Sequence, residues 1–397
     1  MVAVTGKKAP RVRLGIEELV ARPPGWMDGL RLGLLCNQAS TDSCFVHSRD
    51  LLLARFPGRL RCLFSPQHGF FSEKQDNMIE SDHGVDSTGL PVYSLYGESR
   101  RPSAAMFADI DVLLVDLIDV GTRVYTFAWT VVHCLELAAE TGVRVVILDR
   151  PNPLGGRVEG NLLTPAWSSF VGLYGIPMRH GLTLGELALL CNRGMAIGAD
   201  LSVVPMRGWR RDMLFPDTGL PWVFPSPNMP SFATALVYPG QVIWEGSNIS
   251  EGRGTTLPFE LFGAPFIEQD EVAALLAAMP LPGCLLRPLL FEPCFGKWAG
   301  ELCRGFQLHV TDPDAFRPFR TSLALLQVLL GLYPDEFAYK EPPYEYEFER
   351  LPMDLILGDR QVRLALEDGV DILELEASWQ QELAAYREQC EPVLLYR

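Results

Sequence analysis

The first 150 residues contain a series of short, nearly continuous apolar runs, with helical segments between several of them. The runs occupy residues 30–37, 60–65, 92–96, 110–118 and 143–148. Amphipathic stretches at 49–56 and 125–141 lie between them. Strands that are apolar on both faces are typical of a parallel sheet covered by helices on both sides. The sequence therefore predicts an α/β fold.

The chain changes character after this region. Residues 154–239 are rich in proline and glycine, and they contain one expected helix, at 183–192, in which Thr183 and Glu186 can form a capping box. A strand is expected at 201–205. Later segments predict helices at 270–279, 317–333 and 373–387 and a strand at 306–310. We place a domain boundary near residue 238, which gives a larger domain at 1–238 and a smaller α/β domain at 239–397.

Composition excludes several classes of partner. The formal net charge is −15, which disfavours nucleic acid and anionic membranes as partners. The nine cysteines include no Cys-x-x-Cys pair, so we expect reduced thiols in a cytoplasmic protein. No apolar stretch follows the basic N-terminal residues, and none is long enough to cross a membrane.

Common cofactor and nucleophile motifs are missing from the sequence. It contains no Gly-x-Gly-x-x-Gly, no Walker-type lysine loop, no Gly-x-Ser-x-Gly and no His-Glu-x-x-His. We therefore expect neither a metal nor an organic cofactor. A nucleotide-sugar enzyme is disfavoured for the same reason.

Polar residues follow the apolar runs, and ligands of parallel sheets bind outside the carboxyl ends of the strands. Asp116 stands within an apolar run, so it either faces a polar cleft or pairs with Arg123 or backbone amides. His68, which precedes a glycine, is equally consistent with a structural and a functional role. For Asp149, a structural role in an Asx-turn before Pro151 is slightly favoured over a role in a functional site.

The densest polar segment of the chain is residues 244–256. It holds Glu245 and Glu251, six residues apart, together with Arg253 and three glycines. The segment is either a solvated linker or a binding loop. We favour a binding loop, because core packing does not require this combination of charged residues and glycines. Asn228 lies in a rigid loop between two prolines. Paired carboxylates near amides and aromatic rings suit glycoside hydrolysis, in which the acetamido group of the sugar can also attack.

Several motifs resemble those of the exo-β-N-acetylmuramidase family, which was formerly a domain of unknown function. They are LFSPQHG at 63–69, GLPVYSLYG at 89–97, DVGTRVYT at 119–126 and LDRPNP at 148–153, with further matches at 158–160, 179–183, 225–230 and 245–256. The resemblance covers nearly the whole chain. It implies a Rossmann-like N-terminal domain that carries most of the site and a smaller C-terminal α/β domain that closes the cleft. It also implies release of N-acetylmuramic acid from the non-reducing ends of peptidoglycan fragments by a bacterial enzyme without a cofactor.

The chain departs from the family at Gln67, where many members have a glutamate that is catalytic by resemblance. An amide cannot exchange a proton at neutral pH, so another acid must act or the reaction is lost or altered. The candidate acids are Glu245, Glu251, Glu73 and Asp116. We expect Glu251, Glu245, Asp116 and His68 to be catalytic, and substrate to be bound by Gln67, Arg123, Tyr125, Asn152, Asn228 and Arg253. Arg123 and Arg253 would bind the lactyl carboxylate. The alternative function is a non-catalytic or altered-specificity binder of sugars or muropeptides.

Overall fold

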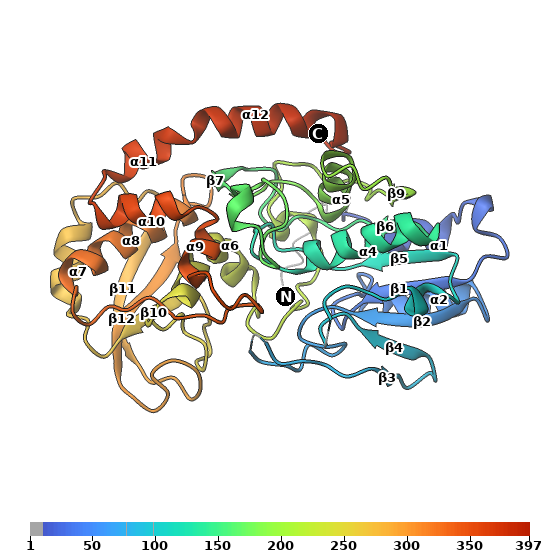
Figure 1. The fold of residues 1–397 in the computed structure, drawn as a ribbon, viewed down its shortest axis with the longest axis horizontal. Coiled ribbons are helices and arrows are strands. Elements are labelled where there is room, and N and C mark those ends of the chain that lie inside the picture. Colours follow the sequence, from blue (N-terminus) through green and yellow to red (C-terminus); the bar gives the residue numbers. More distant parts are fainter. Residues whose placement is uncertain (1–10, 77, 98) are drawn as a thin grey trace, which may run out of the picture.

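The computed structural model describes residues 11–76, 78–97 and 99–397. Its larger sheet has the strand order β3-β4-β2-β1-β5-β6-β9 (Figure 1). All neighbouring strands are parallel except β3, which runs antiparallel to β4. The strands are β1 (Leu32–Cys36), β2 (Leu60–Ser65), β3 (Gly84–Val85), β4 (Pro91–Ser94), β5 (Val112–Asp116), β6 (Arg144–Leu148) and β9 (Leu201–Val204). The predicted α/β fold with a parallel sheet is confirmed, and each of the five apolar runs overlaps a strand.

Helices cover both faces of this sheet, as the apolar runs indicated. Leu34 of β1 packs in one cluster with Leu19 and Leu52, whereas its neighbour Leu35 packs in another with Trp129. These partners lie on α1, α2 and α4, because successive strand residues point to opposite faces. The helices of this region are α1 (Gly15–Ala21), α2 (Ser48–Arg55), α3 (Ala104–Phe107), α4 (Phe127–Thr141) and α5 (Leu184–Gly194).

The capping box predicted at Thr183 is present at the start of α5. The Thr183 hydroxyl accepts a hydrogen bond from the Glu186 backbone N–H at 3.2 Å, and the Glu186 carboxylate accepts one from the Thr183 N–H at 3.0 Å. Two backbone donors that the helix leaves free are thereby satisfied. This local signal was sufficient to fix the start of the helix.

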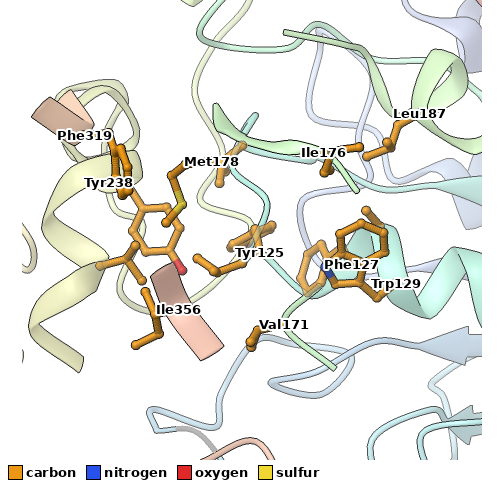
Figure 2. Packing of buried hydrophobic residues seen from close by; sticks show 14 of the residues in the cluster. Tyr125, Phe127, Trp129, Val171, Ile176, Met178, Leu187, Tyr238, Phe319 and Ile356 are labelled. Carbon is orange, nitrogen blue, oxygen red and sulfur yellow. The ribbon is translucent and has the colours of Figure 1, made fainter. Parts of the chain in front are cut away.

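A smaller antiparallel sheet has the order β10-β12-β11. Its strands are β10 (Leu261–Ala264), β11 (Cys284–Phe291) and β12 (Cys303–Val310), and the helices α6 (Phe232–Gln241), α7 (Gln269–Leu276), α8 (Pro318–Leu332), α9 (Pro352–Leu357) and α10 (Arg360–Glu367) lie in the same region. Residue 238, the predicted boundary, lies within α6. One buried cluster runs from the larger sheet through Tyr125 and Tyr238 to Phe319 and Ile356 (Figure 2). The rings of Tyr125 and Tyr238 meet edge to face at 6.1 Å.

The predicted helix at 373–387 is wrong, because the chain forms two helices there. They are α11 (Ile372–Ser378) and α12 (Gln380–Cys390), which meet at Trp379. The indole of Trp379 is buried against Phe319, with ring centroids 6.2 Å apart. This is a tertiary contact, so the local pattern of apolar residues does not predict it. Helix α12 then packs against β7 (Glu159–Leu162), which pairs with β8 (Pro177–Arg179), so the end of the chain returns to the N-terminal region (Figure 1). No helix in the described part of the chain is long and apolar enough to cross a membrane.

Candidate active site

The loop after β2 places Gln67 in a buried polar cluster. Its Nε2 donates to Glu345 Oε1 at 2.8 Å and to the Tyr96 hydroxyl at 3.1 Å, while its Oε1 accepts from the Thr126 hydroxyl. The following residue, His68, has φ of 73°, in the left-handed region that favours glycine. The loop is thus held in a strained turn that points the Gln67 amide at Glu345, and such strain is frequent at functional sites.

Glu345 is the carboxyl that faces this amide, and it comes from the segment just before α9. Its Oε2 accepts a hydrogen bond from the Tyr96 hydroxyl at 2.6 Å, and its side chain is buried. Burial raises the pKa of Glu345 to about 7, although the hydrogen bonds from Tyr96 and Gln67 act in the opposite direction. A carboxyl that exchanges its proton near neutral pH has the property that a general acid needs.

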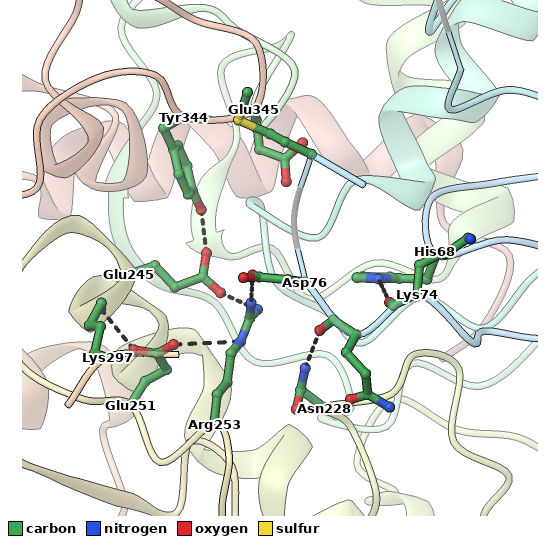
Figure 3. Close-up of polar contacts among 12 residues, drawn as sticks. His68, Lys74, Asp76, Asn228, Glu245, Glu251, Arg253, Lys297, Tyr344 and Glu345 are labelled. Carbon is green, nitrogen blue, oxygen red and sulfur yellow. Dashed lines mark hydrogen bonds and ion pairs between the residues drawn. The ribbon is translucent and has the colours of Figure 1, made fainter. Parts of the chain in front are cut away.

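A second carboxylate, Glu245, is held by a cation and a phenol (Figure 3). Its Oε1 accepts from Arg253 Nη2 at 2.6 Å, and its Oε2 accepts from the Tyr344 hydroxyl at 2.6 Å. Arg253 also donates to Asp76 at 2.9 Å, and its Nε lies 3.6 Å from Glu251. The guanidinium therefore orders three carboxylates around itself, with Glu245 adjacent in space to the Tyr344-Glu345 segment.

Glu251 is fixed by a buried lysine. Lys297 Nζ donates to Glu251 Oε2 at 2.8 Å and to the backbone carbonyls of Trp244 and Ile249. Burial acts to raise the pKa of Glu251, but Lys297 and Arg253 outweigh it, so the pKa is lowered. A carboxylate held in its charged form by two cations is suited to orienting Arg253 and poorly suited to donating a proton.

Two neighbouring cavities share Glu245 and Arg253 in their walls. The narrow one measures about 30 Å³ and reaches Gln67 and Glu345, whereas the open one measures about 540 Å³ and contains Lys297, Trp298 and Lys340 in its wall. The sequence-predicted residues that line one or both cavities are Gln67, His68, Tyr125, Asn228, Glu245, Glu251 and Arg253.

His68 and Asn228 hold the segment that carries Asp76. The His68 Nδ1 lies 2.8 Å from the Lys74 carbonyl oxygen, so this nitrogen carries the hydrogen. Burial lowers the pKa of His68 to about 4, which keeps the ring neutral at pH 7 and leaves Nε2 as an acceptor. Asn228 donates to the Gln75 carbonyl at 2.8 Å. Both side chains therefore position a wall of the site.

The structure places Asp116 outside both cavities. Its carboxylate receives hydrogen bonds from Arg150 at 2.5 and 2.8 Å and from the Ser48 hydroxyl, and it is fully buried. This geometry matches the alternative in which Asp116 is a buried structural residue paired with an arginine, although the partner is Arg150 and not Arg123. Glu73 lines neither of these two cavities, and its carboxylate accepts a hydrogen bond from the Phe71 backbone N–H.

Arg123 and Asn152 are also away from the cavities, which does not fit the substrate-binding roles expected for them. Arg123 donates to the carbonyl oxygens of Asn161, Ile176, Ile356 and Leu357 at 2.7–3.0 Å. Asn152 donates to the Leu182 carbonyl and accepts from the Leu154 N–H, both at 2.9 Å. A motif on a strand-end loop does not reveal whether a side chain turns toward the crevice or into the core.

Sequence reasoning missed Glu345, together with its neighbour Tyr344 and its partner Tyr96. Glu345 belongs to the run Pro342-Pro343-Tyr344-Glu345-Tyr346-Glu347, in which acids alternate with tyrosines after a rigid dipeptide. This alternation is the sequence signal from which Glu345 could have been chosen as a candidate. Only the fold shows that this run lies against the loop after β2, some 280 residues earlier in the chain.

This arrangement defines a class of protein. A crevice beyond the carboxyl end of a parallel strand holds one carboxyl that titrates near pH 7 and a second that is fixed by an arginine and a tyrosine. Two carboxyl groups in unlike environments are the equipment of a glycoside hydrolase.

Comparisons with known proteins give the family. The sequence models of the N-terminal and C-terminal domains of exo-β-N-acetylmuramidase NamZ match residues 32–233 and 236–396. The peptidoglycan β-N-acetylmuramidase NamZ of Bacillus subtilis (strain 168) is 40% identical over 390 residues, which cover 98% of this chain and 92% of that protein. The chain therefore belongs to the exo-β-N-acetylmuramidase NamZ family of glycoside hydrolases, and the resemblance stated from its motifs is confirmed.

Solved structures agree with this assignment. A crystal structure of a DUF1343 family protein from Bacteroides fragilis is 32% identical, with a TM-score of 0.87, and the match covers 98% of this chain and 99% of that one. A second DUF1343 protein from the same organism is 28% identical, with a TM-score of 0.76 over 97% of this chain and 99% of that one. The likeness extends over nearly the whole chain, so Gln67 stands in a complete family fold.

Proposed function

We propose that this chain removes N-acetylmuramic acid from the non-reducing ends of peptidoglycan fragments, with Glu345 as the catalytic acid. The observation that carries the proposal is the position of Glu345. This carboxyl, whose pKa lies near 7, is hydrogen-bonded to the amide that stands where the family resemblance places a catalytic glutamate. Glu345 can therefore supply the proton from a position one hydrogen bond away from residue 67, where the resemblance places the catalytic glutamate.

The other residues have distinct roles in this proposal. Glu345 protonates the leaving oxygen as the glycosidic bond breaks, and Glu245 stabilises the positive charge that develops at the anomeric carbon. The new bond to that carbon is formed by water, either directly or after the acetamido oxygen of the sugar has attacked first. Arg253 and Tyr344 hold Glu245, and Glu251 with Lys297 holds Arg253. Gln67 and Tyr96 orient the Glu345 carboxyl, and the neutral His68 offers Nε2 as an acceptor for a sugar hydroxyl.

Substrate entry through the open cavity requires a movement of the cavity wall. The narrow cavity, at about 30 Å³, has room for roughly one water molecule, so of the two cavities that share Glu245 and Arg253 only the open one, at about 540 Å³, has room for a sugar ring. Glu345 also lines a third cavity of about 410 Å³ on the side of Tyr346. Glu345 and Tyr346 have φ of 47° and 64°, which is strained backbone at the wall between Glu345 and solvent. We infer that this segment shifts when the ring enters and brings Glu345 to the glycosidic oxygen. Crystals soaked with a muramyl sugar that leave 344–346 unmoved would contradict this step.

The direct test is hydrolysis of chromogenic β-glycosides. We expect release of the chromophore from the N-acetylmuramic acid glycoside, and from peptidoglycan oligomers we expect only N-acetylmuramic acid removed from the non-reducing end. Tight binding of the intact glycoside by calorimetry, without cleavage, would instead support a non-catalytic sugar-binding protein. Cleavage within oligomers would contradict the exo-acting assignment.

Lys340 is the proposed contact for the lactyl carboxylate, in place of Arg123. It lines the open cavity, its Nζ lies 5.5 Å from the Tyr344 ring centroid, and it forms no ion pair with any described residue. Lys340→Ala is expected to raise KM for the N-acetylmuramic acid glycoside about tenfold, the effect of losing one charge-assisted contact. Lys340→Arg should retain the wild-type KM. The N-acetylglucosamine glycoside, which lacks the carboxylate, provides the control, and an equal rise in its KM would assign Lys340 a structural role.

We further propose a cytoplasmic location in a bacterium and a role in recycling imported fragments. All nine cysteines are free, and Cys44 and Cys294 are exposed, which suits a reducing compartment. The net charge of −15 gives no reason to expect a nucleic-acid or membrane partner. Fractionation of cells that express the chain from its own gene would test the location, and recovery outside the cytoplasm would overturn it.

A further inference from the structure

A separate polar cavity lies between the β7–β8 hairpin, the start of α8 and the C-terminal helices. It measures about 500 Å³, and it shares no lining residue with the two cavities of the active site. Two of the matched motifs, at 158–160 and 179–183, contribute Glu159 and Arg179 to its wall. The proposed hydrolysis gives these motifs no role.

The wall of this cavity is rich in arginine although the protein as a whole is acidic. Arg157, Arg179, Arg317 and Arg387 line it. The acidic side chains in the wall are Glu159, Asp314 and Glu376. Asp314 is paired with Arg157, and Glu376 with Arg320 at 3.0 Å. Arg317 donates only to backbone carbonyls, and Arg387 is exposed and forms no ion pair with any described residue. Cationic groups therefore remain available to a ligand.

Arg179 is the buried base of the cavity. Only 2% of its surface is exposed, its Nη2 donates to the Leu154 carbonyl at 2.5 Å, and its Nε has no hydrogen-bond partner within the described chain. A guanidinium buried with part of its donor capacity unused is costly, unless a ligand completes its bonds.

Glu159 faces Arg179 across the hairpin without neutralising it fully. Its Oε1 accepts from the backbone N–H groups of Phe319 and Arg320 at 2.9 and 3.1 Å, and so caps α8. Its Oε2 has no partner among the described residues. Burial raises the pKa of Glu159 to about 7, opposed by Arg179, so near neutral pH this carboxyl carries only part of its charge.

We propose that this cavity binds a small phosphate-type oxyanion, with Arg179 at its base and Arg317 and Arg387, which have no acidic partner among the described residues, in its wall. Planar guanidinium groups match the oxygens of phosphate in paired hydrogen bonds, and several of them favour a dianion over a singly charged carboxylate. Free phosphate and the phosphate group of a sugar phosphate present the same chemistry. The 500 Å³ volume has room for either.

The test is calorimetric titration of the full chain with inorganic phosphate, N-acetylglucosamine 6-phosphate and acetate at constant ionic strength. We expect both phosphates to bind and acetate to bind at least about tenfold more weakly. Tighter binding of the sugar phosphate would identify a phosphorylated sugar as the ligand, and equal affinities would identify free phosphate.

A matched pair of variants locates the binding. Arg387→Ala is expected to weaken phosphate binding about tenfold. Arg193→Ala removes the same charge from the last turn of another helix, outside the cavity, and should leave the affinity unchanged. Absence of phosphate binding at millimolar concentration, or equal affinities of the two variants, would overturn the proposal. Neither outcome depends on hydrolase activity, so failure here is distinguishable from failure of the proposed function.

Discussion

Glu345→Gln is expected to lower kcat/KM for the N-acetylmuramic acid glycoside by about 10²- to 10⁴-fold, the usual contribution of a general acid. The substitution keeps the size of the side chain and one oxygen that can accept from the Gln67 amide, but it replaces the oxygen that accepts from the Tyr96 hydroxyl with an NH2 donor and removes the exchangeable proton. Substrate KM should change little. Because this substitution is nearly isosteric, the thermal unfolding temperature should remain close to that of the wild type.

The pH dependence of kcat/KM provides a second test of Glu345 as the general acid. Burial raises the pKa of Glu345 to about 7, and a general acid must be protonated to act, so wild-type kcat/KM should fall as the pH rises through about 7. This alkaline limb should be missing from the residual activity of Glu345→Gln. A wild-type profile that is flat from pH 6 to 9 would assign the proton to another group.

A double variant tests whether Glu345 substitutes for the family's glutamate. Gln67→Glu combined with Glu345→Gln exchanges the carboxyl and the amide across the 2.8 Å hydrogen bond. We expect it to recover at least about tenfold of the activity lost in Glu345→Gln, since the acid is returned to the place that the resemblance indicates. No recovery in a folded double variant would show that the two positions are not interchangeable.

Arg123→Leu is expected to destabilise the protein by about 4 kcal/mol, because it removes four hydrogen bonds to buried backbone carbonyls. The carbonyls of Ile176 and Leu357 each keep one other donor, the Leu163 N–H and the Asn161 amide. Two of these carbonyls belong to Asn161 and Ile176 beside the β7–β8 hairpin, and two belong to Ile356 and Leu357 at the end of α9. The arginine therefore joins the N-terminal and C-terminal regions. Urea unfolding monitored by tryptophan fluorescence measures the loss.

A matched control separates this effect from a general loss of charge. Arg22→Leu removes a guanidinium from an exposed position and should change the stability by less than about 0.5 kcal/mol. At a temperature where Arg123→Leu remains folded, its KM should equal that of the wild type. A raised KM with unchanged stability would return Arg123 to the substrate-binding role that its motif suggested.

Local sequence patterns were reliable where the structure is decided locally or by one face of an element. The runs at 60–65 and 143–148 form strands because a nearly continuous apolar stretch fits best at a position covered on both faces. Thr183 begins α5 because its hydroxyl and Glu186 satisfy donors three residues apart. The helix at 373–387 failed because the burial of Trp379 against Phe319 depends on α8, which lies far away in sequence.

The candidate site shows the same division between local and distant causes. The loop at 65–69 and the segment at 244–256 were predicted from the sequence as site segments, since loops rich in glycine, amides and carboxylates have few structural uses. The structure brings both segments to the walls of the two neighbouring cavities. The sequence could not tell that Asp116 pairs with Arg150, or that Arg123 turns into the core, because the partner of a buried charge is chosen by packing.

Residue type and order along the chain were enough to establish the parallel α/β fold, the family and the absence of a carboxyl at position 67. The folded structure alone shows which carboxyl faces Gln67. Glu345 reaches Gln67 through the folding of a segment 278 positions away, and its pKa near 7 arises from burial that exists only once the C-terminal region closes over the loop after β2. A proton donor is defined by its surroundings, and those surroundings are assembled by the fold.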